Sequence, residues 1–246
     1  MTRTHSPERT GVAVRDLVFS YSPDTPILRG ISFDLTPGER IALLGPTGTG
    51  KSTLMENLIG LKLPDSGQIW IGGTPLNSDT LSEVRRQVGF AFQDPDDQLF
   101  MPTIFDDVMF GPCNYGVPPA EAADRADRLL DQFGLTQCAR RSVHELSGGQ
   151  KRLATLATIL ALNPSILILD EPTNGLDPWW RRHLAEILQD LPVQVLLIAS
   201  HDLRWVGRVT GRSLVLGDGK IQVDRPTSDL LEDGDTLERC GLPMDC

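Results

Sequence analysis

The sequence predicts an α/β fold with a mixed sheet core, an N-terminal antiparallel β-subdomain and an inserted α-helical subdomain. Three observations predict it. Residues 11–35 alternate apolar and polar side chains, as half-buried strands do. Residues 118–133 and 153–162 have the spacing of helices. After residue 164, strand-length apolar segments alternate with a helical segment, an order typical of a largely parallel sheet.

The N-terminal part of the chain is expected to be rich in strands. Two alternating segments are separated by a turn at Ser22–Pro26. A short apolar strand then runs into a glycine loop, which is followed by a helical segment at 51–61. The strands expected here are Gly11–Tyr21, Ile27–Leu35, Arg40–Leu44, Gly67–Ile71 and Gln87–Phe92.

From residue 94 the composition changes. Asp94–Gly116 is rich in Asp, Pro and aromatic residues, and we expect its apolar stretch from Leu99 to Met109 to be a loop. Helical spacing follows at Pro118–Phe133 and Leu153–Leu162. The core then resumes with strands at Ser165–Leu169 and Val193–Ala199, a helix at Pro178–Gln189, and a hairpin of Ser213–Leu216 and Ile221–Val223.

These elements predict one domain spanning 1–242. Its core would comprise 11–93 and 164–223, and its helical subdomain 94–163. Residues 224–246 would form a short acidic C-terminal tail, because they carry seven acidic and two basic residues.

Charge excludes several classes of function. The 246 residues include 33 acidic and 23 basic ones, giving a formal net charge of −10. We therefore expect no nucleic-acid partner bound through a general basic surface and no docking on anionic lipid.

Nothing in the sequence predicts a membrane span or an export signal. No apolar run approaches the roughly 20 residues that a spanning helix needs, so we expect no direct lipid insertion. The first ten residues lack a hydrophobic core, so we expect no secretory signal. Cysteines at 113, 138, 240 and 246 form no CxxC pair, which is typical of free thiols in a reducing cytosol, and we expect no disulfide or metal site at the last two.

The glycine loop carries the strongest functional motif. Residues 45–53 match G-x-x-x-x-G-K-[ST] between a predicted strand and a predicted helix, which predicts a P-loop NTPase with a RecA-like core. Glycines let backbone N–H groups converge on phosphate, Lys51 supplies a cation, and the Ser52 hydroxyl can ligate Mg²⁺. The alternative is a glycine-rich turn that only connects two elements. The predicted nucleotide ligands are Gly45, Thr47, Gly48, Thr49, Gly50, Lys51, Ser52 and Thr53.

Two further segments carry groups suited to phosphate chemistry. The apolar strand at 166–169 ends in Asp170 and Glu171, which suit Mg²⁺ binding and activation of a water molecule, respectively. The alternative is an acidic turn after a buried strand. Leu146–Arg152 precedes a helix, with Ser147 as a plausible N-cap and a Gly-Gly pair that exposes backbone N–H groups.

Taken together, these motifs resemble the ATP-binding-cassette (ABC) family over residues 11–242. Residues 45–53 resemble its Walker A loop, 146–150 its signature LSGGQ, 166–171 its Walker B strand and Asn174–Asp177 its D-loop. The resemblance implies ATP and Mg²⁺ as cofactors. It assigns nucleotide contacts also to Tyr21, Gln93, Ser147, Gly148, Gly149, Gln150 and Asp177, catalysis to Lys51, Glu171 and His201, and Mg²⁺ ligation to Ser52, Gln93 and Asp170.

Three of these residues have ordinary alternatives when taken alone. Tyr21 could be a partly buried aromatic at a strand end, Gln93 a surface polar residue, and His201 a structural histidine after a strand. Their order among the other motifs favours the roles that the family assigns. Tyr21 would be the aromatic that stacks on adenine, Gln93 the Q-loop glutamine and His201 the switch histidine. We expect His144 and His183 to be structural or surface residues.

In this family two nucleotide-binding domains dimerise head to tail, so the resemblance implies a second such domain as partner, in a homodimer or a heterodimer. ATP would lie between the Walker A loop of one chain and the signature of the other. Water would attack the γ-phosphate with Glu171 as base, and His201 would stabilise the developing charge.

Phe92–Phe100 and Thr103–Pro112 resemble the cobalt/nickel and energy-coupling-factor (ECF) branch, which imports metal ions or vitamins. The resemblance implies an integral membrane subunit that contacts Asp94–Pro112, and a peripheral location on the cytoplasmic face of the membrane. Apolar residues of this loop would form the contact or would pack on the helical subdomain; they are Leu99, Phe100, Met101, Ile104, Phe105 and Met109.

Alternatives remain open at this point. They are another ABC branch, including exporters, a soluble non-transport ATPase, and a nucleotide-binding regulator without turnover, against which the Asp170-Glu171 pair argues. The Trp179-Trp180 pair is unusual after a D-loop. Adjacent helical residues point about 100° apart, so we expect at most one of the two to be buried.

Overall fold

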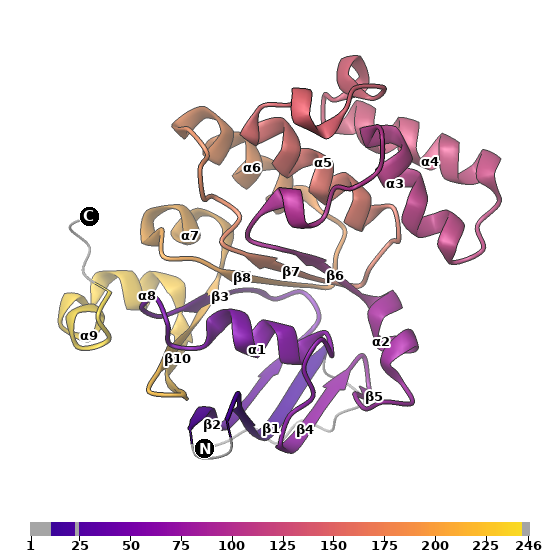
Figure 1. Ribbon diagram of the computed structural model, residues 1–246. Helices are drawn as coiled ribbons and strands as arrows, with labels where there is room; N and C mark the ends of the chain where they lie inside the picture. The colour runs from indigo at the N-terminus through magenta and orange to yellow at the C-terminus, as the bar shows by residue number, and fades with distance from the viewer. Residues whose placement is uncertain (1–10, 23–24, 243–246) are drawn as a thin grey trace.

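The computed structural model describes residues 11–22 and 25–242. The first ten residues, on which the expectation about a secretory signal rests, lie outside this range, as do Cys246 and part of the turn predicted at Ser22–Pro26. Figure 1 shows two sheets with helix α1 (Lys51–Leu58) between them and a group of helices over the larger sheet.

The smaller sheet is antiparallel and N-terminal, as predicted. Its order is β2-β1-β4-β5, formed by β1 (Val12–Ser20), β2 (Pro26–Leu35), β4 (Ser66–Ile71) and the two-residue β5 (Thr74–Pro75). Its inner face and one face of the larger sheet bury a common apolar core around Leu54, Met55 and Leu58 of α1.

The larger sheet has the order β10-β9-β3-β8-β7-β6. Neighbours from β9 to β6 run parallel, and only the C-terminal hairpin of β9 and β10 is antiparallel, which confirms the largely parallel sheet. Its strands are β3 (Arg40–Leu44), β6 (Val88–Ala91), β7 (Ile166–Asp170), β8 (Val195–Ala199), β9 (Arg212–Gly217) and β10 (Lys220–Pro226).

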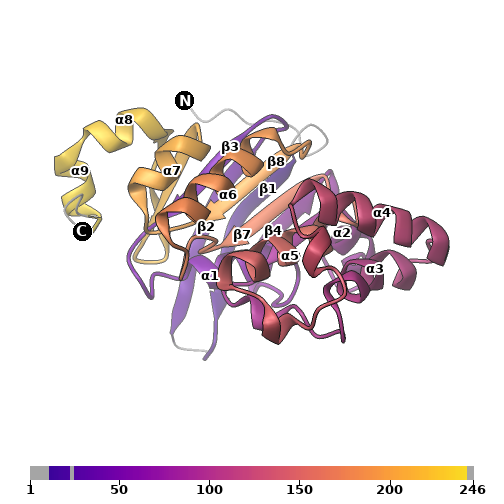
Figure 2. The same ribbon diagram turned by 90° about the horizontal axis from the view of Figure 1, so that it is seen from above.

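Helices cover the other face of this sheet. α3 (Ile104–Asn114), α4 (Pro119–Gln132) and α5 (Gly148–Leu160) form the helical group, and α6 (Pro178–Asp190) and α7 (Leu203–Val209) lie beside it. Figure 2 shows α3–α5 at one end of the molecule and α8 (Thr227–Glu232) and α9 (Gly234–Arg239) at the other. α2 (Leu81–Gln87) leads directly into β6, one residue later than the predicted strand start.

The predicted helix at 118–133 is confirmed within two residues. Its apolar stripe is buried at Ala122, Ala126 and Leu130, while Leu129 is half-buried. Short polar side chains cap several helices, as at Thr103, whose hydroxyl oxygen accepts the Asp106 N–H at the start of α3 (3.2 Å).

The expectation of a loop over 99–109 is wrong for its second half. α3 occupies Ile104–Asn114, and Pro112 is tolerated within its last turn. Of the apolar residues in this segment, Leu99, Ile104 and Phe105 are buried in the core, while Phe100 is 65% exposed. Met101 and Met109 are half-buried. The segment therefore both packs on the helical group and leaves an aromatic side chain on the surface.

The acidic C-terminal segment is folded onto the core. It forms the end of β10 and the two short helices α8 and α9, and it buries Leu230 and Leu237 in these helices and Leu242 after them. None of the helices in residues 11–22 and 25–242 is long and apolar enough to cross a membrane.

We predict that Leu230→Ala lowers the free energy of unfolding by about 2–5 kcal/mol, because Leu230 is fully buried and the substitution leaves a cavity. Chemical denaturation with the exposed neighbour Asp229→Ala as control checks this. Equal stability of the two variants would contradict the packing of α8.

Candidate nucleotide-binding site

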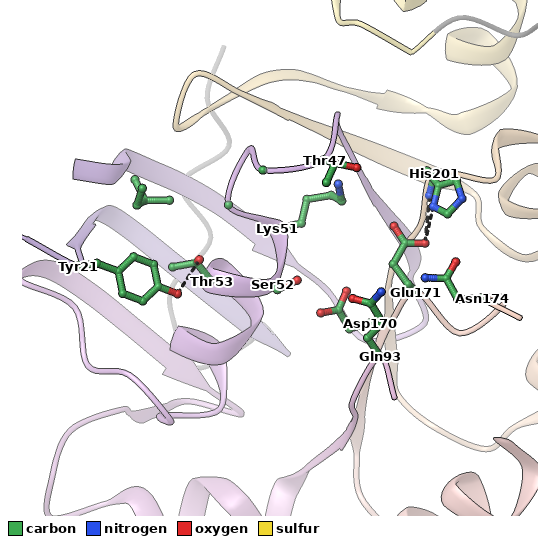
Figure 3. Close-up of a pocket in the computed structure, with 13 residues that line it drawn as sticks. Tyr21, Thr47, Lys51, Ser52, Thr53, Gln93, Asp170, Glu171, Asn174 and His201 are labelled. Atoms are coloured by element: carbon green, nitrogen blue, oxygen red, sulfur yellow. Dashed lines mark hydrogen bonds and ion pairs between the residues drawn. The ribbon is translucent and has the colours of Figure 1, made fainter. Parts of the chain in front are cut away.

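A pocket of about 330 Å³ lies where the parallel strands β3, β6, β7 and β8 end. Loops after these four strands supply most of its wall, because the carboxyl ends of parallel neighbours meet at one edge of the sheet. Figure 3 shows their side chains converging on one space. The lining residues are Tyr21, Ile27, Thr47, Gly48, Gly50, Lys51, Ser52, Thr53, Gln93, Asp170, Glu171, Asn174 and His201.

Two glycines give the loop after β3 its shape. Gly45 has φ +148°, and a Cβ there would lie 2.3 Å from the Leu216 carbonyl oxygen. Gly50 has φ +99°, and a Cβ there would lie 2.8 Å from the Ile27 side chain. The loop therefore passes close to its neighbours and turns directly into α1, whose first N–H groups lack partners within the helix. Such a turn is suited to binding an anion through these free N–H groups.

Lys51 is a buried cation without a close carboxylate partner among the residues described here. Its Nζ donates to the carbonyl oxygens of Gly45 (2.6 Å) and Pro46 (3.0 Å). Burial lowers the pKa of Lys51, and the nearby carboxylates of Glu171 and Asp170 oppose that shift. The ammonium can exchange these neutral carbonyl acceptors for phosphate oxygens, because its hydrogen bonds to charged oxygens are stronger.

Asp170, the last residue of β7, is 5% exposed, and its Oδ1 has no hydrogen-bond partner within the described part of the chain. Burial raises the pKa of Asp170, against the effect of a hydrogen bond from Ser52. An unpaired buried carboxylate oxygen beside a hydroxyl and the Gln93 amide is a set of oxygen ligands that suits Mg²⁺. These three residues therefore fit the ion that the sequence predicts.

Glu171 and His201 lie together across the ends of β7 and β8. The Glu171 Oε2 atom accepts the His201 main-chain N–H (3.3 Å) and lies 2.9 Å from the His201 Nδ1 atom (Figure 3). Glu171 has φ +46°, a strained conformation that costs about 1–3 kcal/mol for a residue with a side chain. The turn that imposes this strain aims the carboxylate into the pocket.

Tyr21 stands at the rim of the pocket with its side chain 59% exposed. Its hydroxyl lies 3.2 Å from the Thr53 Oγ1 atom and accepts a hydrogen bond from Lys62 (2.7 Å). The Lys62 Nζ atom also lies 4.5 Å from the ring centroid. Sequence reasoning missed Lys62 and the pocket residue Ile27, since no motif includes them.

Two parts of the predicted site lie outside this pocket. The signature turn at 146–150 caps α5: the Ser147 hydroxyl accepts the Gln150 N–H (3.3 Å), and the Gln150 side chain accepts the Ser147 N–H (2.9 Å). Ser147 and Gly148 are exposed, whereas Gly149 is buried. Asp177 caps α6 by accepting the N–H groups of the next two tryptophans (2.9 Å each). The N-cap predicted at Ser147 is confirmed.

Gly45 and Thr49 belong to the loop but do not line the pocket; Thr49 Oγ1 donates to the Pro46 carbonyl (2.9 Å). Arg152 was not predicted. It is 2% exposed, and its guanidinium donates to the carbonyl oxygens of Phe92 (2.9 Å) and Gln93 (2.7 Å). It thereby ties α5 to the backbone that carries Gln93.

Comparison with known proteins agrees with this geometry. Residues 28–174 match the family model described as ABC transporter. A putative ABC transporter ATP-binding protein of Geobacter sulfurreducens is 47% identical over 94% of this chain and 92% of its own. The ECF transporter ATP-binding protein EcfA of Methanothermobacter thermautotrophicus is 39% identical over 95% of this chain and 76% of its own. The structure resembles CbiO1 of Clostridium perfringens, described as part of the ABC transporter complex CbiONQ, with a TM-score of 0.84 and 32% identity over 96% of each chain.

Proposed function

This chain belongs to the ABC transporter family of ATP-binding ATPases, and we propose that it powers an ECF-type importer of a metal ion, cobalt or nickel, or of a vitamin. One observation carries the proposal. The pocket gathers Lys51, Asp170, Glu171 and His201 around one space, while the signature turn presents Ser147 and Gly148 to solvent, outside that space.

We propose that the signature turn acts on a nucleotide held by a second chain. Its first N–H groups lie at the start of α5, where a helix attracts anions, yet none of its residues lines the pocket of its own chain. Head-to-tail association of two nucleotide-binding domains, each spanning 1–242, would place it against a γ-phosphate. The D-loop residue Asp177 would lie at the same junction.

Within each pocket the residues take separate parts. The Walker A glycines and Thr47, Thr49, Ser52 and Thr53 hold phosphates, and Lys51 neutralises them. Tyr21 stacks on the adenine. Glu171 accepts a proton from the attacking water, and His201, which holds the Glu171 carboxylate, stabilises charge on the γ-phosphate. Ser52, Gln93 and Asp170 hold Mg²⁺, which when bound supplies positive charge to the transferring phosphoryl group.

The surface near Asp94–Pro112 is proposed to contact an integral membrane subunit. A groove of about 270 Å³ is bordered there by Phe100 and Phe110, which are 65% and 44% exposed and meet edge to face with ring centroids 5.0 Å apart. Exposed aromatics beside a groove are typical of a protein interface. The contact would hold the chain at the cytoplasmic face of the membrane. The transported solute would not touch this chain.

We predict that Glu171→Gln reduces ATP hydrolysis by at least about a hundredfold, since the loss of a general base costs 10²–10⁴ in rate. The variant should still bind ATP and accumulate as an ATP-dependent dimer, measured by phosphate release and by light scattering after gel filtration. An unchanged hydrolysis rate would contradict the assignment of Glu171 as the general base.

The chain is also expected to co-purify with an integral membrane subunit from gently solubilised membranes. Phe100→Asp should weaken this recovery, because it puts a charge into an apolar contact. Leu61→Asp, at an exposed leucine away from the groove, is the matched control. Recovery of the wild-type chain only as a free protein would contradict the transport role.

A further inference from the structure

Trp180 lies directly on the signature turn. It is half-buried on the first turn of α6 and packs against the helical core. A Cβ built on Gly149 would lie 2.2, 2.3 and 2.5 Å from its Cδ2, Cε2 and Cγ atoms. The indole therefore occupies the space that any side chain at position 149 would need. Gly149 is required here by packing as well as by any phosphate contact.

The same tryptophan is fixed by the D-loop. Its main-chain N–H donates to the Asp177 Oδ1 atom at 2.9 Å. Trp180 thus links the D-loop to the signature turn. Its backbone is bonded to Asp177, and its ring packs on Gly149.

The start of α5 is also held on its other side. Arg152, three residues after Gly149, donates to the carbonyl oxygens of Phe92 and Gln93. The signature turn is therefore tied to two other parts of the fold. Arg152 and an ion pair of Lys151 with Asp96 (2.6 Å) join it to the Q-loop segment, and Trp180 joins it to the D-loop helix.

The neighbouring Trp179 donates its main-chain N–H to Asp177 in the same way (2.9 Å), but its side chain lies elsewhere. It is 58% exposed and stacks on His183, with ring centroids 5.2 Å apart. It meets Trp180 edge to face at 4.7 Å and faces away from the core. The two tryptophans thus offer a matched pair, one on the signature turn and one on the surface.

We propose that Trp180 is a positioning residue that sets the signature turn relative to the D-loop. The proposal rests on the function proposed above, in which both motifs address a nucleotide on another chain. A shift of the turn would then impair ATP-dependent closure of two chains and turnover. It would leave ATP binding in the chain's own pocket intact, because that pocket contains neither Trp180 nor the turn.

The test is Trp180→Ala with two separate readouts. In the Glu171→Gln background, we expect ATP-dependent dimerisation to weaken about tenfold to hundredfold, since misplacement by about 1 Å costs a factor of that order. Binding of a fluorescent ATP analogue to the monomer should stay within about twofold of the parent. With Glu171 intact, kcat should fall more than KM rises. Trp180→Phe should restore part of the loss, and Trp179→Ala should behave like the parent.

A double-mutant cycle keeps the inference testable if Trp180→Ala also lowers stability. Gly149→Ala alone forces a Cβ into the indole, whereas in the Trp180→Ala background that space is open. The dimerisation defects should therefore be non-additive. Additive defects, or a Trp180→Ala chain that dimerises like its parent, would overturn the proposal. Failure of the Glu171→Gln parent to dimerise with ATP would instead refute the proposed function.

Discussion

Everything in the candidate site depends on four parallel strands that end at one edge of a sheet. β3, β6, β7 and β8 are paired in parallel within the larger sheet, so the segments after them open on the same space. Gln93, Glu171 and His201 follow three different strands, and the fourth strand carries the glycine loop. No local segment of the chain could place these groups together; the register of the sheet does so.

The electrostatics of this edge differ from those of the whole molecule. The net charge is −10, and seven of the 33 acidic residues lie in the C-terminal segment 224–246. In the pocket, a buried lysine faces two buried carboxyl groups and is bonded only to backbone carbonyls among the described residues. Such a site can bind an anionic nucleotide because its own N–H groups and cation set the local field, whatever the total charge.

The sequence predicted the parts of this structure that repeat with a period or follow a fixed spacing. Strand alternation, the helical stripe with Leu130 and the capped turn at Ser147 are all found, because each depends on neighbours a few residues apart. The prediction failed where contacts between residues far apart in the sequence determine the structure. The composition of Asp94–Gly116, rich in Asp, Pro and aromatic residues, does not reveal α3, because the burial of Ile104 depends on distant partners. Arg152 on the Q-loop carbonyls and Trp180 on Gly149 join residues 30 to 60 positions apart, which no pattern in one sequence reveals.

The central claim is that one chain holds only part of a complete site, with the signature turn serving the pocket of another chain. The most direct measurement mixes two defective chains in the Glu171→Gln background, one carrying Lys51→Ala and the other Ser147→Arg. Each chain alone should retain no ATP through gel filtration. Their mixture should retain it, because the heterodimer has one intact Walker A loop opposite one intact signature turn. Retention by the Ser147→Arg chain alone, or none in the mixture when the parent Glu171→Gln chain retains ATP, would contradict the claim.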